Sequence, residues 1–197
     1  MSAPNPAERS LLATGARRAH PPSPDSEKLV AKIRELTRRS EALVALFDAR
    51  SIAGERHLLS AWAHLGRSRR SGTSRLRDRG AELALYLSGD DQLGRALARI
   101  GISASTEEFV LIAERPHELA PLLEGFGLVA DPTIYPRPPN EGTLERLGIT
   151  AADRSVVPSS GWEGLVLERV ALVDLSPGSS TPAKAEGAIP PKSGKVR

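Results

Sequence analysis

Two short apolar runs constrain the fold of this chain more than any other feature. They are ALVALFDA at 42–49 and EEFVLIA at 107–113, and each has the length and composition of a buried strand. A further short strand is expected within SLLATGARRA at 10–19. The remaining sequence carries mainly helical signals. It therefore predicts a mixed α/β (α+β) fold, a single domain with a small sheet of few strands and many helices.

Helical spacing of apolar residues predicts several helices before the second long run. They are expected at about 26–39, 54–67, 74–87 and 90–100. A Gly/Ser/Thr break at 71–74 separates the second from the third. Asp90 is expected to cap the fourth helix, and Gly101 to end it in the left-handed conformation.

The C-terminal half is predicted to hold shorter helices. Pro116 opens one that closes near Gly125, and the proline-rich segment 131–140 is expected to lack regular structure. Ser160 and Glu163 have the spacing of a capping box, which predicts the start of a final helix.

Composition limits the organisation and the chemistry of the chain. The sequence predicts disordered tails at 1–8 and 176–197 around one domain at 9–175. Cysteine is absent, which excludes disulfides, thiolate metal sites and a cysteine nucleophile. No run approaches the length of a membrane span, and MSAPNPAERS lacks the apolar segment of a signal peptide. A cytoplasmic protein is expected.

Positive charge is concentrated in one place. The segment HLGRSRRSGTSRLRDRG at 64–80 holds six arginines and one acid, Asp78. Residues 50–79 hold eight arginines and two acids, although the formal charge of the whole chain is only +3. This imbalance favours an anionic partner, most simply a nucleic acid. The alternative is a solvated face whose arginines partly complement a helix dipole.

The same residues suggest which nucleic acid would bind. On a helix that begins at Ser74, Arg75 and Arg79 would share one face. Guanidinium groups bind phosphate oxygens in pairs and stack on bases. Trp62 belongs to the predicted core face of its helix, so the segment lacks the aromatic platforms of typical single-strand binders. A short flexible single strand would suit it better than a duplex groove.

Catalytic signals are missing from the sequence. The four histidines lack the i, i+4 spacing of zinc helices, and the patterns of a phosphate-binding loop and of a serine nucleophile are absent. Helix capping and a first-turn position account for Asp90 and Asp91. We therefore predict no catalytic residue, no metal and no cofactor. An enzyme would need a cleft lined by His57, Glu82 and Asp90.

An ordered set of motifs resembles a known family. FDARSIAGERHLLSAWAHL and SRLRDRGAELALYLSGDDQLGRALARIGI resemble the small regulatory subunits of the KEOPS complex, the kinase-binding and tRNA-binding family that includes the PRPK-binding protein. The matching positions are Gly54, His57 and Leu58, then Glu82, Leu85, Tyr86, Ser88 and Gly89, then Gln92, Leu93 and Ala96. LVLERVALVDL at 165–175 is similar to the closing helix of the family. The resemblance covers about residues 10 to 175.

The resemblance implies a role in threonylcarbamoyladenosine modification of tRNA, without catalysis by this subunit. It implies binding and stimulation of the atypical kinase of the complex, and capture of tRNA by its 3′ CCA end. The implied tRNA-binding residues are His57, Arg67, Arg69, Arg70, Arg75, Arg77, Arg79, Ser88, Gly89 and Gln92. The kinase-binding face is not assigned.

Three alternatives stay open at this point. His57 could contact RNA or only tie down the Asp48 loop, and Gln92 could read a base edge or only cap a turn. The whole chain could also be a purely protein-binding kinase regulator with no direct RNA contact.

Overall fold

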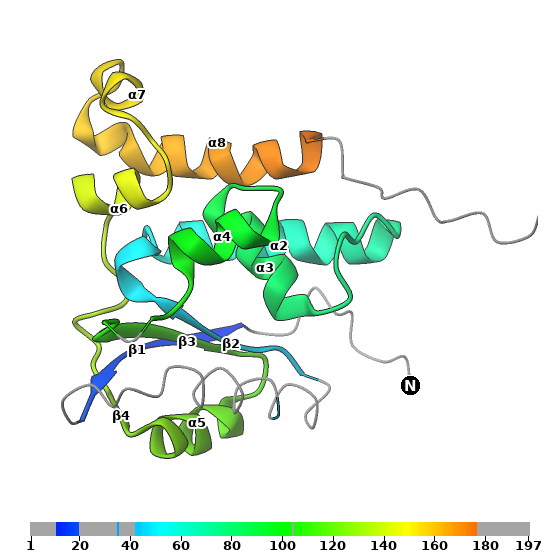
Figure 1. The fold of residues 1–197 in the computed structure, drawn as a ribbon, viewed down its shortest axis with the longest axis vertical. Helices are drawn as coiled ribbons and strands as arrows, with labels where there is room; N and C mark the ends of the chain where they lie inside the picture. Colours follow the sequence, from blue (N-terminus) through cyan, green and yellow to red (C-terminus); the bar gives the residue numbers. More distant parts are fainter. Residues whose placement is uncertain (1–10, 20–34, 36–41, 104, 177–197) are drawn as a thin grey trace, which may run out of the picture.

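The structure, a computed structural model, describes residues 11–19, 35, 42–103 and 105–176. Within them a four-stranded antiparallel sheet lies between two unequal layers of helix (Figure 1). Its strand order is β2-β3-β1-β4. The strands are β1 (Leu12–Arg18), β2 (Val44–Asp48), β3 (Glu108–Ala113) and β4 (Leu128–Ala130). The predicted mixed α+β fold is confirmed.

Alternation along the two central apolar runs divides the core between the two faces of the sheet. Phe47 of β2 and Val110 of β3 belong to the larger cluster, under the main helical layer. Leu46 and Leu111 belong to the smaller cluster on the opposite face. Every residue of β2 is buried, which explains why its first four residues, VALF, are all apolar rather than alternating with polar ones.

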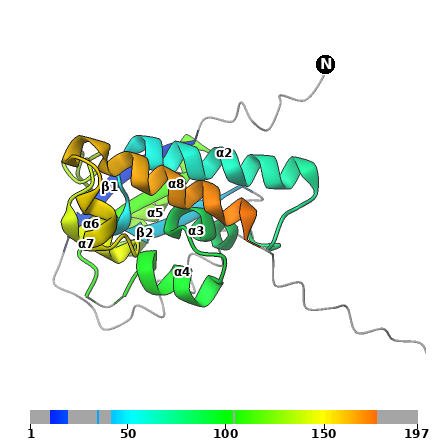
Figure 2. The same cartoon turned by 90° about the horizontal axis from the view of Figure 1, so that it is seen from above.

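The larger helical layer covers one face of the sheet (Figures 1 and 2). It consists of α2 (Glu55–Ser71), α3 (Arg79–Ser88), α4 (Leu93–Ile100) and α8 (Trp162–Leu175). On the opposite face lies α5 (Leu119–Phe126), whereas α6 (Glu141–Arg146) and α7 (Ala151–Ser155) lie at one end of the molecule. Short 3-10 turns span Ala49–Ser51 (η2), Pro116–Glu118 (η3) and Ser159–Gly161 (η4).

Helices α2 and α8 run side by side in the same direction (Figure 2). Near their starts Arg56 pairs with Glu163, and Asp174 in the last turn of α8 contacts His64 in the middle of α2. Helix α2 therefore continues past the end of α8 (Figure 2). Each helix C-terminus carries partial negative charge, so the end of each helix favours cations.

The arginine segment differs from its prediction. Helix α2 continues to Ser71, so Arg67, Arg69 and Arg70 lie inside it, and Gly72 ends it in the left-handed conformation. Helix α3 begins at Arg79 rather than Ser74, because the Asp78 carboxylate accepts the backbone N–H of Ala81 and caps the helix there. The prediction that Arg75 and Arg79 share a helical face is therefore wrong.

Other helix ends also differ from their predictions. The N-cap of α4 is Gln92, while Asp90 accepts the N–H of Gln92 in the preceding turn. Gly101 is extended rather than left-handed, and it is needed because a Cβ there would lie 2.3 Å from the Leu97 carbonyl oxygen. Ser160 and Glu163 form no capping box, since α8 begins at Trp162 without a side-chain cap.

The remaining predictions fall into two groups. Segment 131–140 contains no helix or strand, as predicted, and β4 was not predicted. The expected helix at 26–39 lies outside the described residues except for Glu35, and so do the two expected tails except for Ser176. No helix of the described part is both long and apolar enough to cross a membrane.

Candidate nucleic-acid interface

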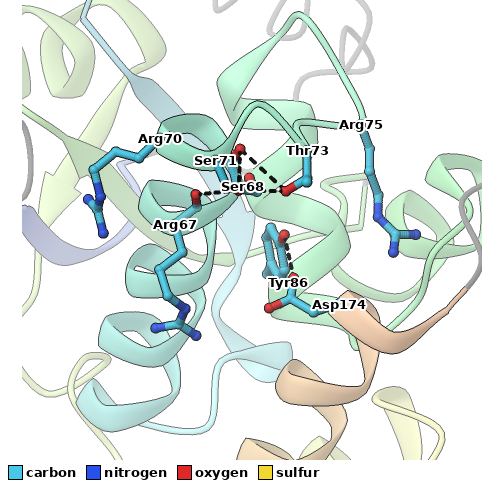
Figure 3. Close-up of a pocket in the computed structure, with 8 residues that line it drawn as sticks. All are labelled: Arg67, Ser68, Arg70, Ser71, Thr73, Arg75, Tyr86 and Asp174. Carbon is cyan, nitrogen blue, oxygen red and sulfur yellow. Dashed lines mark hydrogen bonds between the residues drawn. The ribbon is translucent and has the colours of Figure 1, made fainter.

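A pocket of about 640 Å³ opens where α2 and α8 end (Figure 3). We call it the α2–α8 pocket. The loop at 72–78, which joins α2 to α3, forms one wall, and α3 contributes a tyrosine. The lining residues are Arg67, Ser68, Arg70, Ser71, Thr73, Arg75, Tyr86 and Asp174. Three of the six predicted arginines therefore line one concave surface.

The loop wall of this pocket is held by a buried carboxylate. Glu82 is 0% exposed and accepts hydrogen bonds from Ser68 Oγ at 3.0 Å, Ser74 Oγ at 2.6 Å and the backbone N–H of Arg75 at 3.0 Å. It also pairs with Arg69 at 2.8 Å. A buried charge is tolerated only with such partners. Glu82 therefore fixes the course of the loop that carries Arg75.

A second polar group forms the floor. The Tyr86 hydroxyl donates to Asp174 Oδ1 at 2.8 Å, and His64 Nδ1 lies 2.6 Å from Asp174 Oδ2. Burial, together with the bond to Asp174, raises the pKa of Tyr86 to about 12. The phenol therefore stays protonated as a donor, and Asp174 is held from two sides.

Three of the six arginines are used inside the protein. Arg69 pairs with Glu82 and donates to the carbonyls of Leu76 and Arg77. Arg75 donates to the carbonyls of Val173 and Ser176 at the end of α8. Arg79 bonds with both oxygens of Glu114 and lies over the Trp62 ring, 5.5 Å from its centroid. These contacts join the loop, the last helix and the sheet.

The other three arginines are free to meet a partner. Arg67, Arg70 and Arg77 are exposed, and their guanidinium groups make no hydrogen bond or ion pair with the described residues. In Figure 3, Arg67 and Arg70 extend from α2 on the side of Tyr86 opposite to Arg75, and Arg70 approaches Gly66. Arg77 is near in sequence but does not line the pocket.

His57 lies in the core rather than at the pocket. It is 0% exposed, its Nδ1 accepts the N–H of Ala53 at 3.0 Å, and its Nε2 lies 2.9 Å from the Leu87 carbonyl oxygen. Burial lowers its pKa to about 4, so the ring is neutral at pH 7. This favours the structural alternative, in which His57 holds the segment that follows Asp48.

The turn after α3 is also covered by protein. Ser88 is buried and donates to the Leu85 carbonyl. Gly89 is left-handed, with φ of 63°, and a Cβ there would lie 2.7 Å from the Cβ of Arg169 on α8. Gln92 is exposed at the start of α4. None of these residues lines the α2–α8 pocket.

Comparison with known proteins identifies the family. The family model described as kinase binding protein CGI-121 matches residues 25–120, which include β2, β3, the arginine segment and helices α2 to α4. The chain belongs to the CGI-121 family. The resemblance drawn from the sequence is thereby confirmed, and CGI-121 is a family of kinase-binding proteins without catalytic activity of their own. No curated protein sequence matches the chain significantly.

The sequence analysis of this CGI-121 chain identified some residues of the α2–α8 pocket and missed others. Arg67, Arg70 and Arg75 of the pocket lie inside the matched range, whereas Asp174 lies beyond it. Sequence reasoning missed Asp174 although one signal marked it, since an acid in the last turn of a helix opposes the helix dipole. Tyr86 was recognised only as a family position. Ser71 and Thr73 carried no signal beyond the turn itself.

The residues named for an enzymatic alternative have structural roles in this CGI-121 chain. His57 and Glu82 are completely buried, and Asp90 pairs with Arg95 and Arg99. Within the described residues, no group of three histidines or acids is placed to hold a metal ion.

Proposed function

We propose that this chain is a non-catalytic KEOPS subunit that binds and stimulates the atypical kinase of the complex and recruits tRNA by its 3′ CCA end. Membership in the CGI-121 family supports the kinase-binding part. The tRNA-binding part rests on one observation, the gathering of Arg67, Arg70 and Arg75 around the α2–α8 pocket.

The proposed set of RNA-contacting residues is smaller than the set expected from the sequence. Arg67, Arg70 and Arg77 have exposed guanidinium groups to offer to phosphates, and Arg75 lines the pocket from the loop. Arg69 and Arg79 position the loop and α3 through Glu82 and Glu114 instead. Gln92 stays a prediction, since it is exposed but lies outside the pocket.

The size of the pocket supports a single-stranded ligand. A volume of about 640 Å³ falls within the range of small-molecule sites, roughly 300–1,000 Å³. It suits one or two nucleotides of a flexible terminus. A duplex would need a projecting helix or ribbon to enter its groove, whereas this surface is concave.

The direct test compares tRNA with and without its terminal CCA across a salt series. We expect removal of CCA to weaken binding at least about tenfold, because the contacts with the terminal nucleotides are lost. Equal affinity for the two RNAs would contradict tRNA capture by the 3′ end.

A second test assigns the arginines. Arg67→Ala should weaken tRNA binding and flatten the slope of log K against log salt by about one unit, as expected for one lost phosphate contact. Arg115→Ala is the matched control, because Arg115 is also exposed but does not line the pocket. An unchanged slope for both variants would remove Arg67 from the interface.

The purely protein-binding alternative has an observation in its favour. Arg69, Arg75 and Arg79 are used internally, and a helix C-terminus such as the end of α8 favours cations. A triple Arg67→Ala, Arg70→Ala, Arg77→Ala variant separates the two functions. Under the alternative it binds and stimulates the kinase normally and tRNA has no effect. A kinase pull-down with tRNA present or digested away tests both partners together.

A further inference from the structure

One carboxylate lies among the arginines of the α2–α8 pocket. Among the described residues that line it, Asp174 is the only acid, and it lies one residue before the end of α8. The partial negative charge at the end of α8 and the phosphates of an RNA would both oppose it. A pocket for phosphate alone would be better without Asp174, so this residue indicates a ligand that also brings hydrogen-bond donors.

The geometry of Asp174 defines how many donors it could take. A carboxylate has about four lone-pair sites, two on each oxygen. Tyr86 occupies one site on Oδ1, and His64 occupies one on Oδ2. One site therefore remains on each oxygen, and the side chain is 38% exposed. Asp174 is thus a fixed acceptor for a pair of adjacent donors.

Few parts of an RNA present two adjacent donors beside a phosphate. An internal ribose has only its 2′ hydroxyl free, because its 3′ oxygen is esterified. The terminal ribose has free 2′ and 3′ hydroxyls on neighbouring carbons, and acidic side chains bind ribose hydroxyls in nucleotide sites. We infer that Asp174 receives the 2′,3′-diol of the terminal ribose of a tRNA while the exposed guanidinium group of Arg67 faces its phosphates. This inference rests on the proposed function and adds the group that distinguishes a free 3′ end from internal RNA.

The experiment varies only the terminal sugar. Wild-type protein is titrated with three forms of one tRNA: intact, ending in 2′,3′-dideoxyadenosine, and lacking CCA. The dideoxy form keeps the base and the phosphates. We expect it to bind about tenfold to a hundredfold more weakly than intact tRNA, the range for lost hydrogen bonds to a charged group.

Variants of α8 assign the effect to Asp174. Asp174→Asn keeps the shape and can still accept from Tyr86, but it loses one acceptor oxygen, so it should bind intact and dideoxy tRNA with nearly equal affinity. Glu168→Gln is the matched control, since Glu168 is an exposed acid of the same helix outside the pocket, and it should discriminate as the wild type does. The coupling between the protein change and the RNA change isolates the contact.

The outcomes separate this inference from the proposed function. If intact and dideoxy tRNA bind equally while tRNA without CCA binds weakly, tRNA capture stands and the role of Asp174 is overturned. If all three bind equally, the proposed function fails and the inference fails with it. If Asp174→Asn still discriminates as strongly as wild type, another group, or a base amino group elsewhere, reads the terminus and the inference is wrong. The wild-type comparison decides the diol even if this variant does not fold.

Discussion

Glu82 shows how a single residue organises the arginine segment. Its carboxylate is fully buried on the core side of α3, yet it gathers two hydroxyls, one backbone N–H and one guanidinium from the loop and the last turns of α2. Removing the charge leaves these donors without an anionic partner. The loop that bears Arg75 and Arg77 would lose its anchor.

We predict that Glu82→Gln lowers the free energy of unfolding by about 3 kcal/mol, the usual cost of breaking one side of a buried ion pair. Urea unfolding measures this directly. Glu168→Gln, at an exposed position, should change it by less than about 0.5 kcal/mol. Equal effects of the two substitutions would contradict the anchoring role.

His57 makes stability depend on pH. Burial lowers its pKa in the folded protein to about 4, from 6.5 for an unperturbed histidine. Between these values the unfolded chain binds a proton that the folded chain does not. The contribution of His57 is therefore complete above about pH 6.5 and is lost as the pH falls towards 4, by on the order of 3 kcal/mol in total.

Urea unfolding of the wild type and His57→Gln between pH 7 and pH 4.5 checks this pH dependence. The difference in unfolding free energy between the two proteins should shrink as the pH falls, because only the wild type carries the histidine term. A difference that stays constant over this range would show that His57 titrates normally.

Residue-level contacts were the part that sequence could reveal least. The arginine excess at 64–80 was visible, but its division into internal and exposed guanidinium groups was not. Arg79 meets Glu114 across 35 positions of the chain, and Arg75 meets Ser176 across 101. Such pairs depend on the packed fold, which no local pattern encodes. Asp174 could be suspected only from its position near a helix end.

At the scale of elements, caps decide where the arginines lie. Helix α2 ends at Gly72, and Asp78 starts α3, so six residues of loop separate Ser71 from the cap. The prediction of a helix from Ser74 followed helical spacing and overlooked Asp78 as a cap. The strands at 42–49 and 107–113 were predicted well because full burial requires continuous apolar residues. Strand β4 has only three residues, two of them exposed, and gives no such signal.

We predict that Asp78→Ala destabilises the protein by about 1 kcal/mol, because α3 loses its N-cap bond. Ser160→Ala should change stability by less than about 0.5 kcal/mol, since Ser160 caps no helix in the structure. Denaturant midpoints of the two variants measure the contrast. A larger loss of stability for Ser160→Ala than for Asp78→Ala would instead support the capping box expected at Ser160.

At the scale of the whole molecule, the internal arginines connect separate layers. Arg79 joins the start of α3 to Glu114, which also accepts the N–H of Leu43 beside β2. Arg75 joins the loop to the end of α8. The pocket is thus built on contacts that reach the sheet and the last helix, and its shape depends on the assembled domain.

Because some arginines of the segment are used internally and others are exposed, Arg79 and Arg67 should differ in their effects on stability and on tRNA binding. Arg79→Ala should lower the free energy of unfolding by about 3 kcal/mol, because it breaks a largely buried pair. Arg67→Ala should change stability by less than about 0.5 kcal/mol but weaken tRNA binding. Unfolding and binding titrations on both variants test the prediction, and parallel losses in both measurements would contradict it.

Gly89 lies where the turn after α3 packs against α8. The last helix rests directly on this residue at Arg169, five positions before Asp174. A single added methyl group there would have to lift the helix. The Asp174 carboxylate would move with it, because it lies five residues, or roughly 7.5 Å, further along the same helix. The position of Asp174 in the pocket therefore depends on Gly89, because only a residue without a Cβ lets α8 pack this closely against the turn.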